Sequence, residues 1–144
     1  ELDTFPGDGS MRHDLAMLFM KQRNWQAAAD EFGLLLNKQP NNVVARLGQT
    51  QALFNLEDYG RAARVLAPAL ASQPDDPDVL LLHANILAKT GQTGAAKRVA
   101  DRAQELHAAR IARDKAAREG NGALEAMGGD PADQVTPTVA PLAP

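Results

Sequence analysis

The residue types that most often carry catalysis or bind metal ions are few in this chain, and their spacing indicates no such site. The three histidines, His13, His83 and His107, have no second His or Glu at the helical spacing that a metal ion requires. The chain has no cysteine, which excludes disulfides, thiolate metal sites and a Cys nucleophile. Its glycine pairs lack the strand–turn–helix context of a phosphate-binding loop. We therefore expect a protein that is not an enzyme and that needs no cofactor or metal.

Two charged segments need a separate interpretation. Residues 75–78 read Asp-Asp-Pro-Asp, which fits a cation site but is explained more simply as a turn and a helix N-cap, where negative charge is favoured. Residues 97–118 hold seven Lys and Arg against three acidic residues, which fits a contact for an acidic partner, a nucleic acid or the chain's own acidic tail. Because no aromatic residue is interleaved with these charges and the net charge is −3, we expect a solvated helix face and no nucleic acid.

The composition favours one helical domain with acidic ends. The chain has 144 residues, of which 44% are hydrophobic and only 4% aromatic, and it is rich in alanine, as closely packed helices are. No apolar run approaches the roughly 20 residues of a membrane-spanning helix. We expect residues 1–9 to form an acidic arm and residues 120–144 a disordered Gly/Pro/Ala tail or linker, each with a net charge of −3. The domain between them, residues 10–119, is mildly basic.

The strongest signal in the sequence is a repeat of about 34 residues, which is typical of arrays of helical hairpins. Pro40 and Pro74 are 34 residues apart, and each is followed by a polar pair. The same spacing relates two series of small residues and two of large residues: Ala16, Thr50 and Ala84; Ala28, Ala62 and Ala96; Phe19, Leu53 and Leu87; Phe32, Leu66 and Ala100. Small residues allow the helices of one hairpin to approach closely, and large residues fill the space between hairpins.

Capping and helix-breaking residues predict six helices, at about residues 11–22, 25–38, 43–56, 59–72, 77–90 and 93–107. Ser10, Asn42 and Asp76 are the expected N-caps. Pro68 lies inside the fourth helix, where it should produce a kink. Neither Gly nor Pro occurs in residues 95–119. The last helix therefore either continues without a break or bends near His107 and folds back as a capping helix.

The repeated positions resemble the tetratricopeptide repeat (TPR) family. The matching residues are Leu15, Ala16, Phe19, Trp25, Ala28, Phe32 and Pro40, then Ala62, Leu66, Ala69 and Pro74, then Ala84, Leu87, Ala96 and Ala103. The resemblance implies an all-α fold, a right-handed array of three TPR-type helical hairpins plus a C-terminal extended or capping helix. The repeats would span about residues 9–42, 43–76 and 77–110, with a basic helix end at 111–119.

The resemblance also implies that the first helix of each hairpin lines a concave groove. The groove residues would be His13, Met17, Met20, Lys21, Val44, Leu47, Gln51, Phe54, Asn55, Leu81, Asn85 and Lys89. Their apolar members would form a patch large enough to mark an interaction site. The positive residues with which some TPR proteins grip a chaperone's C-terminal carboxylate are missing. We therefore expect the partner to be an apolar or amphipathic segment of another protein, with filling by Leu2 and Phe5 or by the last helix as the alternative.

Two functions fit these expectations. The first is a chaperone- or adaptor-like module, similar in layout to the small repeat-type chaperones of bacterial type III secretion systems. The second is a structural scaffold or oligomerisation domain of a larger bacterial envelope or assembly protein, with a homodimer formed through the C-terminal helix. The chain begins at Glu1 instead of Met, so we expect a processed product or a fragment. A bacterial cytoplasm and a periplasm are both compatible with the absence of cysteine.

Overall fold

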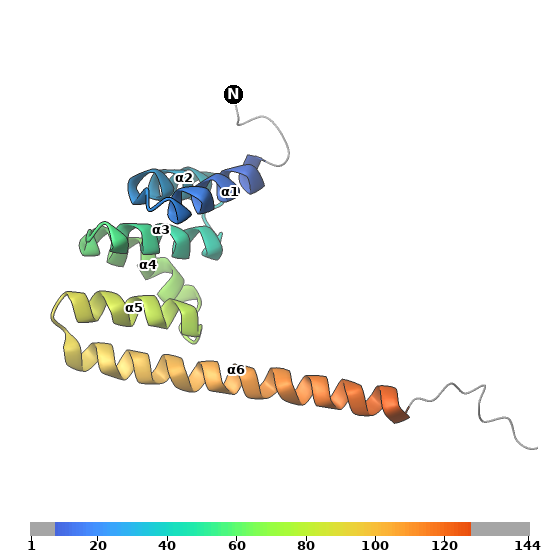
Figure 1. Cartoon of the computed structure of the whole chain (residues 1–144). Helices are drawn as coiled ribbons and strands as arrows, with labels where there is room; N and C mark the ends of the chain where they lie inside the picture. The colour runs from blue at the N-terminus through green and yellow to red at the C-terminus, as the bar shows by residue number, and fades with distance from the viewer. Residues whose placement is uncertain (1–7, 128–144) are drawn as a thin grey trace, which may run out of the picture. The chain divides into compact units, whose positions relative to one another are not determined.

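The part of the chain that the structure describes folds into six α-helices and contains no strand (Figure 1). The computed structural model describes the backbone of residues 8–127 and the side chains of residues 9–122. The helices are α1 (Asp8–Lys21), α2 (Trp25–Lys38), α3 (Val43–Asn55), α4 (Tyr59–Ser72), α5 (Pro77–Lys89) and α6 (Thr93–Met127). The predicted all-α fold is confirmed, and the predicted bounds of the second and fourth helices are those of α2 and α4.

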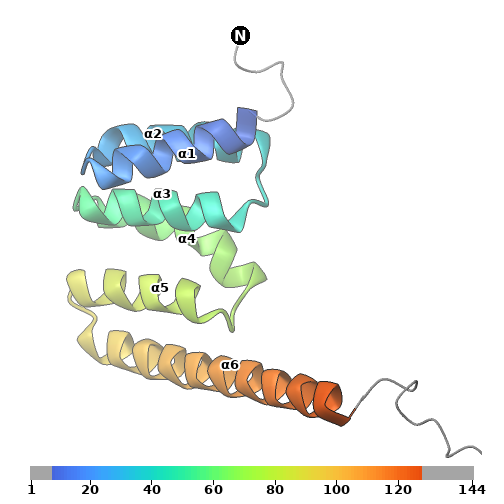
Figure 2. The ribbon, with the colours of Figure 1, turned by 45° about the vertical axis from the view of Figure 1, so that its right-hand side comes forward.

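The helices pack in chain order as antiparallel pairs. Each of α1 to α4 packs on the helix that follows it, and α3 also contacts α5. Figures 1 and 2 both show α1, α3 and α5 stacked in one layer, with α2 and α4 behind it. The chain divides into two compact units, Glu1–His107 and Ala108–Pro144, and α6 contributes residues to both. The layer of α1, α3 and α5 lies wholly within the first unit.

Three turns repeat the same backbone hydrogen bonds at intervals of 34 residues. The donor and acceptor pairs are Arg23 to Met20 and Asn24 to Phe19 after α1, Glu57 to Phe54 and Asp58 to Leu53 after α3, and Gly91 to Ala88 and Gln92 to Leu87 after α5. Arg23, Glu57 and Gly91 all have a positive φ, of 58°, 62° and 86°. These are the features of the Schellman motif, in which a left-handed residue ends a helix. The six helices are therefore consistent with a helical repeat of three hairpins.

Side-chain caps begin the helices that follow these turns and the longer loops. Asn42 accepts a hydrogen bond from the N–H of Ala45 at 3.0 Å, and Asp76 accepts one from the N–H of Asp78 at 2.8 Å. Both residues were expected as N-caps, and both predictions are confirmed. The cap at Asp76 also supports the simpler interpretation of the acidic segment at residues 75–78.

The start of α1 differs from the prediction. The helix begins at Asp8, so Ser10 lies within it and the prediction of an N-cap at Ser10 is wrong. Residues 8 and 9, expected in the acidic arm, belong to the helix as well. A Cβ on Gly9 would lie 3.5 Å from Leu35 Cδ1, so the first turn of α1 lies against the end of α2. This tertiary contact outweighs the low helix propensity of glycine.

The end of the last helix also differs from the prediction. α6 continues to Met127, so residues 120–127, expected in the tail, are helical. Of the two alternatives for the last helix, the continuous one is confirmed. Gly120 and Gly122 do not end the helix, because a glycine costs only about 1 kcal/mol relative to alanine once a helix is propagating. Residues 128–144, the rest of the expected tail, lie outside the described residues.

The small residues of the repeat are buried as expected, whereas the series of large residues is buried only in part. Ala28, Ala62 and Ala96 are buried, and so are Ala16, Thr50 and Ala84. Phe32 and Leu66 are fully buried, whereas Ala100 at the corresponding position of the third hairpin is partly exposed. The core therefore lies where successive helices of the first unit meet.

Pro68 does not end α4, which continues to Ser72. Proline has no N–H, so the carbonyl four residues earlier in the helix loses its usual donor. The Arg46 side chain of α3 lies close to this site, where it donates one hydrogen bond to the Val65 carbonyl at 3.0 Å and another to the Pro40 carbonyl at 2.9 Å. The Val65 carbonyl is next to the Arg64 carbonyl that Pro68 leaves without its donor. Arg46 therefore joins this turn of α4 to the loop between α2 and α3.

Candidate protein-binding surface

The sequence-predicted groove residues lie on α1, α3 and α5, whose layer faces the viewer in Figure 1. Three large apolar side chains among them are well exposed, one on each helix. Met17 is 42% exposed on α1, Val44 is 63% exposed on α3 and Leu81 is 50% exposed on α5. We call Met17, Val44 and Leu81 the exposed apolar row. Lys21, Asn85 and Lys89 are exposed polar members of the predicted set.

The other apolar residues of the predicted groove pack against the protein itself. Met20, Leu47 and Phe54 are partly buried and contact the hydrophobic core. The Phe54 ring also meets the Tyr59 ring edge to face, with centroids 5.3 Å apart. These side chains therefore form the base of the surface more than its contact points.

Three polar members of the predicted groove, Gln51, Asn55 and His13, make contacts within the protein. Gln51 donates a hydrogen bond to the Asn55 side chain at 3.1 Å, within α3. The imidazole of His13 lies 6.0 Å from the Phe32 ring, measured between centroids, in an edge-to-face arrangement. His13 thereby links α1 to α2. No arrangement of these groups resembles a catalytic set.

A hollow of about 290 Å³ lies beside Leu81, between α5 and the first part of α6. It is lined by Pro77, Asp78, Leu81, Ala103, Gln104 and His107. Its wall is mostly apolar, and Ala103, which lines it from α6, is small and buried. A single apolar side chain of a ligand would fit in this hollow.

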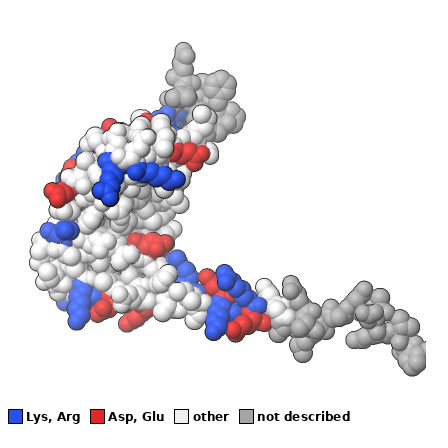
Figure 3. Space-filling view, in the orientation of Figure 1, with Lys and Arg blue, Asp and Glu red and all other residues white. Residues whose placement is uncertain are grey.

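Charged side chains are sparse over the middle of the helix layer. Arg46 is the only charged residue in α3, and α5 carries only Asp78 and Lys89 besides His83. Figure 3 shows the face over α3 as largely uncharged, with Lys and Arg gathered above it over α1. This distribution suits an apolar ligand better than a strongly charged one.

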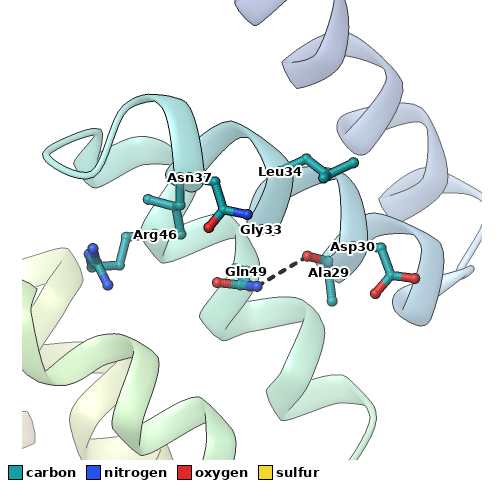
Figure 4. A pocket seen from close by; sticks show the side chains of 8 residues that line it. Ala29, Asp30, Gly33, Leu34, Asn37, Arg46 and Gln49 are labelled. Carbon is teal, nitrogen blue, oxygen red and sulfur yellow. Dashed lines mark hydrogen bonds between the residues drawn. The ribbon is translucent and has the colours of Figure 1, made fainter. Parts of the chain in front are cut away.

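A second pocket, of about 590 Å³, lies between α2 and α3 and was not expected from the sequence (Figure 4). Its lining includes Leu34 and Asn37 of α2 and Arg46 and Gln49 of α3. The Gln49 amide points to α2 and donates a hydrogen bond to the Ala29 carbonyl at 3.2 Å. The sequence carries no sign of this pocket, because it arises from the spacing of two helices that the chain brings together in space.

The described residues offer little else that could do chemistry. Among the described side chains, those of residues 9–122, there is no cluster of three or more His, Asp or Glu residues that could hold a metal ion. Burial lowers the pKa of the His83 imidazole below its ordinary value of 6.5, because the charged form is poorly solvated there. Burial therefore favours the uncharged form of His83.

The basic segment of α6 is exposed along most of its length. Lys97, Arg98, Arg102, Arg113, Lys115 and Arg118 are all exposed. Arg102 lies 3.5 Å from the Asp75 carboxylate and 3.6 Å from that of Glu105, and Lys115 lies 3.9 Å from that of Glu119. Exposed ion pairs of this kind contribute little to stability, so this face is mainly a solvated one.

No protein-family model matches the chain, and no curated protein matches its sequence. Among the helices of residues 8–127, none combines the length and the apolar character needed to cross a membrane. What the structure shows is that the described part of the chain is all-helical, with six helices packed in chain order, consistent with a helical repeat.

Proposed function

We propose that this protein is a TPR-type interaction module that binds an apolar or amphipathic segment of another protein along the layer of α1, α3 and α5. In this role it acts as a chaperone or adaptor, comparable in layout to the repeat-type chaperones of bacterial secretion systems. The observation that carries the proposal is the exposed apolar row, in which each of the three helices presents one large apolar side chain. Exposed apolar side chains that gather on one face often mark an interaction site.

The arrangement suggests how binding would work. Leu47 and Phe54 are held against the core, whereas the three side chains of the exposed apolar row are open to solvent. The Met17 side chain is flexible and adapts to differently shaped ligands. A bound segment would place apolar side chains against the row and one of them in the hollow beside Leu81. Burial of apolar area at about 25 cal/mol per Å² would supply the affinity and would shield the segment from aggregation.

Exposed positions allow a test that leaves the fold intact. The full chain is used as bait in a lysate of the source cell, and the protein captured is purified and titrated against the bait. We expect Met17→Glu, Val44→Glu and Leu81→Glu each to weaken binding about tenfold or more, because each removes one buried apolar contact and introduces a charge. Leu47 and Phe54 are poorer choices, since their substitution also disturbs the core.

Leu34→Glu is the matched control. Leu34 is 46% exposed on α2, in the other helix layer, so the same substitution changes charge and exposed apolar area to a similar degree. Binding should be unchanged in this variant. Equal loss of binding in the control, or full binding in all three row variants, would contradict the proposal.

The second unit supports a different candidate function, that of a scaffold or oligomerisation domain. Every described side chain of residues 108–122 except Arg110 is exposed, and Ile111 is 55% exposed. In this role two copies would associate through the C-terminal helix. Sedimentation of Ile111→Glu beside the unmodified chain tests it, because the variant should remain a monomer at concentrations where the unmodified chain dimerises.

A further inference from the structure

One face of α1, which has no part in the proposed function, corresponds by the repeat to a face of α3 that packs on the preceding hairpin. Gln49 of α3 reaches back to the preceding hairpin through its hydrogen bond to Ala29. Gly48, its neighbour, lies against the Phe32 ring of the same hairpin. This face of α3 therefore packs on the hairpin before it. By the 34-residue spacing, the corresponding face of α1 carries Met11, Leu15 and Leu18.

At the first and last of these three positions, the residues are buried in the second and third hairpins and exposed in the first. The middle position holds Gln49 and His83 in those hairpins, and both are partly buried. Ala45 and Ala52 of α3 are fully buried, and Val79 and Ile86 of α5 are 0% and 4% exposed. On α1 the corresponding Met11 and Leu18 are 65% and 49% exposed, and Leu15 between them is 40% exposed. The first hairpin thus presents an apolar face of the kind that the other two hairpins bury against a neighbouring helix. We call Met11, Leu15 and Leu18 the α1 seam.

The spacing within the α1 seam suits a helix as its partner. Its residues follow one another at intervals of four and three, which is the pattern of one side of a coiled coil. Asp14 and Lys21 are seven residues apart and lie along the same flank of the seam. The Asp14 side chain is 80% exposed, and Lys21 is exposed at the end of α1. The opposite flank faces α2, where Arg12 lies 3.0 Å from the Glu31 carboxylate.

We propose that a second copy of this chain docks on the α1 seam, with the two α1 helices antiparallel about a two-fold axis. An axis midway between Leu15 and Leu18 places Leu15 of each copy against Leu18 of the other, so that the interface contains this contact two times. It also places Asp14 of each copy beside Lys21 of the other. Both residues lie on the same flank, seven residues apart, so each reaches its counterpart when the two helices run antiparallel. A seam with opposite charges at its two ends is complementary to itself only in the antiparallel orientation. The flank that faces α2 stays clear of the pairing.

The seam is short, so the dimer should form in a concentration-dependent manner. From Met11 to Lys21 it extends over roughly 15 Å of helix, which corresponds to a small interface. We expect sedimentation velocity of the full chain to show a reversible monomer–dimer equilibrium. Leu15→Glu should abolish the dimer, and the unfolding temperature should be little changed because Leu15 is partly exposed already.

A charge exchange tests the orientation. Asp14→Lys and Lys21→Asp should each raise the dimer dissociation constant about tenfold, because each replaces two attractive pairs by two repulsive ones. An equimolar mixture of the two variants should restore the dimer. In the mixed dimer the lysine introduced at position 14 of one copy faces the aspartate introduced at position 21 of the other, and the two unmodified residues face each other. Asp101→Lys and Lys97→Asp on α6 are the matched controls and should leave the equilibrium unchanged.

Three results would overturn the inference. One is a monomer at every concentration. Another is a dimer that responds to neither charge variant but is lost with Ile111→Glu, which would place the contact on the C-terminal helix. The third is a dimer that forms only after residues 1–7 are deleted, which would show that these residues cover the α1 seam. None of these results bears on the binding surface of the proposed function, because Met17, Val44 and Leu81 lie outside the seam.

Discussion

The Phe32 ring of α2 lies directly against Gly48 of α3. A Cβ on Gly48 would lie 2.5 Å from Phe32 Cζ, closer than side-chain atoms approach one another. Phe32 is fully buried, so a shift of its ring would disturb the core around it. Between the second and third hairpins the corresponding residues are Leu66 in place of Phe32 and Leu82 in place of Gly48. The glycine is therefore what allows the first two hairpins to approach closely around a large aromatic ring.

Gly48→Ala should consequently destabilise the protein. The clash is expected to cost about 1–3 kcal/mol, which exceeds the gain of up to about 1 kcal/mol that alanine brings to a helix. Chemical denaturation of the variant measures the difference. Gly60→Ala is the control, because nothing lies within 4 Å of a Cβ at that position of α4, and it should stabilise. Equal stabilisation in both variants would show that the ring yields.

At the positive-φ position of the repeated turns, we expect a glycine to stabilise the protein and a side chain to destabilise it. Glu57 and Arg23 hold a left-handed conformation that costs a side chain roughly 1–2 kcal/mol, while Gly91 adopts it freely. Glu57→Gly should raise the midpoint of thermal unfolding, and Gly91→Ala should lower it. Gly94→Ala, inside α6, serves as the control for a glycine whose φ is not positive. An unchanged midpoint for Glu57→Gly would mean that two free energies cancel: the strain that glycine relieves in the folded turn and the extra conformational entropy that it gives the unfolded chain.

Arg46 should contribute more to stability than the other arginines of its hairpin. Its guanidinium donates to two backbone carbonyls, and hydrogen bonds to a charged group are worth about 1.5–3 kcal/mol. Arg46→Met keeps much of the apolar stem but removes both bonds, so we expect a loss of about 2 kcal/mol in the free energy of unfolding. Arg61→Met, at an exposed position of α4, should change the same free energy very little. A similar effect of both substitutions would contradict the role of Arg46.

His83 makes the stability depend on pH in a defined direction. Its pKa is lowered by burial, so the unfolded chain binds a proton more readily than the folded one. The stabilisation is complete above the unfolded pKa of 6.5 and is lost as the pH falls from there towards the lower folded pKa. Thermal unfolding should therefore show a smaller acid-induced decrease in His83→Gln than in the unmodified chain. Glutamine is a suitable replacement, because Gln49 occupies the corresponding position of the second hairpin.

Much of the fold follows from local features of the sequence. Asn42 and Asp76 were identified as caps from residue type alone, because a cap depends only on the few residues around it. The two ends of the helical part were not, because Gly9 and Gly120 suggest breaks that the structure does not make. At Gly9 the contact of α1 with α2 keeps the chain helical. At Gly120 the helix continues because the preceding turns of α6 have already formed.

The candidate site was predicted only in part. The sequence and its family resemblance place twelve residues on the first helices of the hairpins, which is where α1, α3 and α5 hold them. Neither could separate Met17, Val44 and Leu81, which are exposed, from Leu47 and Phe54, which pack on the core. Burial depends on neighbouring helices, and residue type alone does not reveal them.

By itself the sequence determined the helical class, the 34-residue period and the places where most helices begin, since these depend on interactions between residues that are near in the chain. The tertiary structure alone decided which apolar faces find a partner. Val79 and Ile86 are buried because α5 follows another hairpin, whereas Met11 and Leu18 occupy the same positions of the repeat and are exposed. The physical reason is that each hairpin buries its apolar face only against a neighbour, so identical patterns have different surroundings at different points of the array.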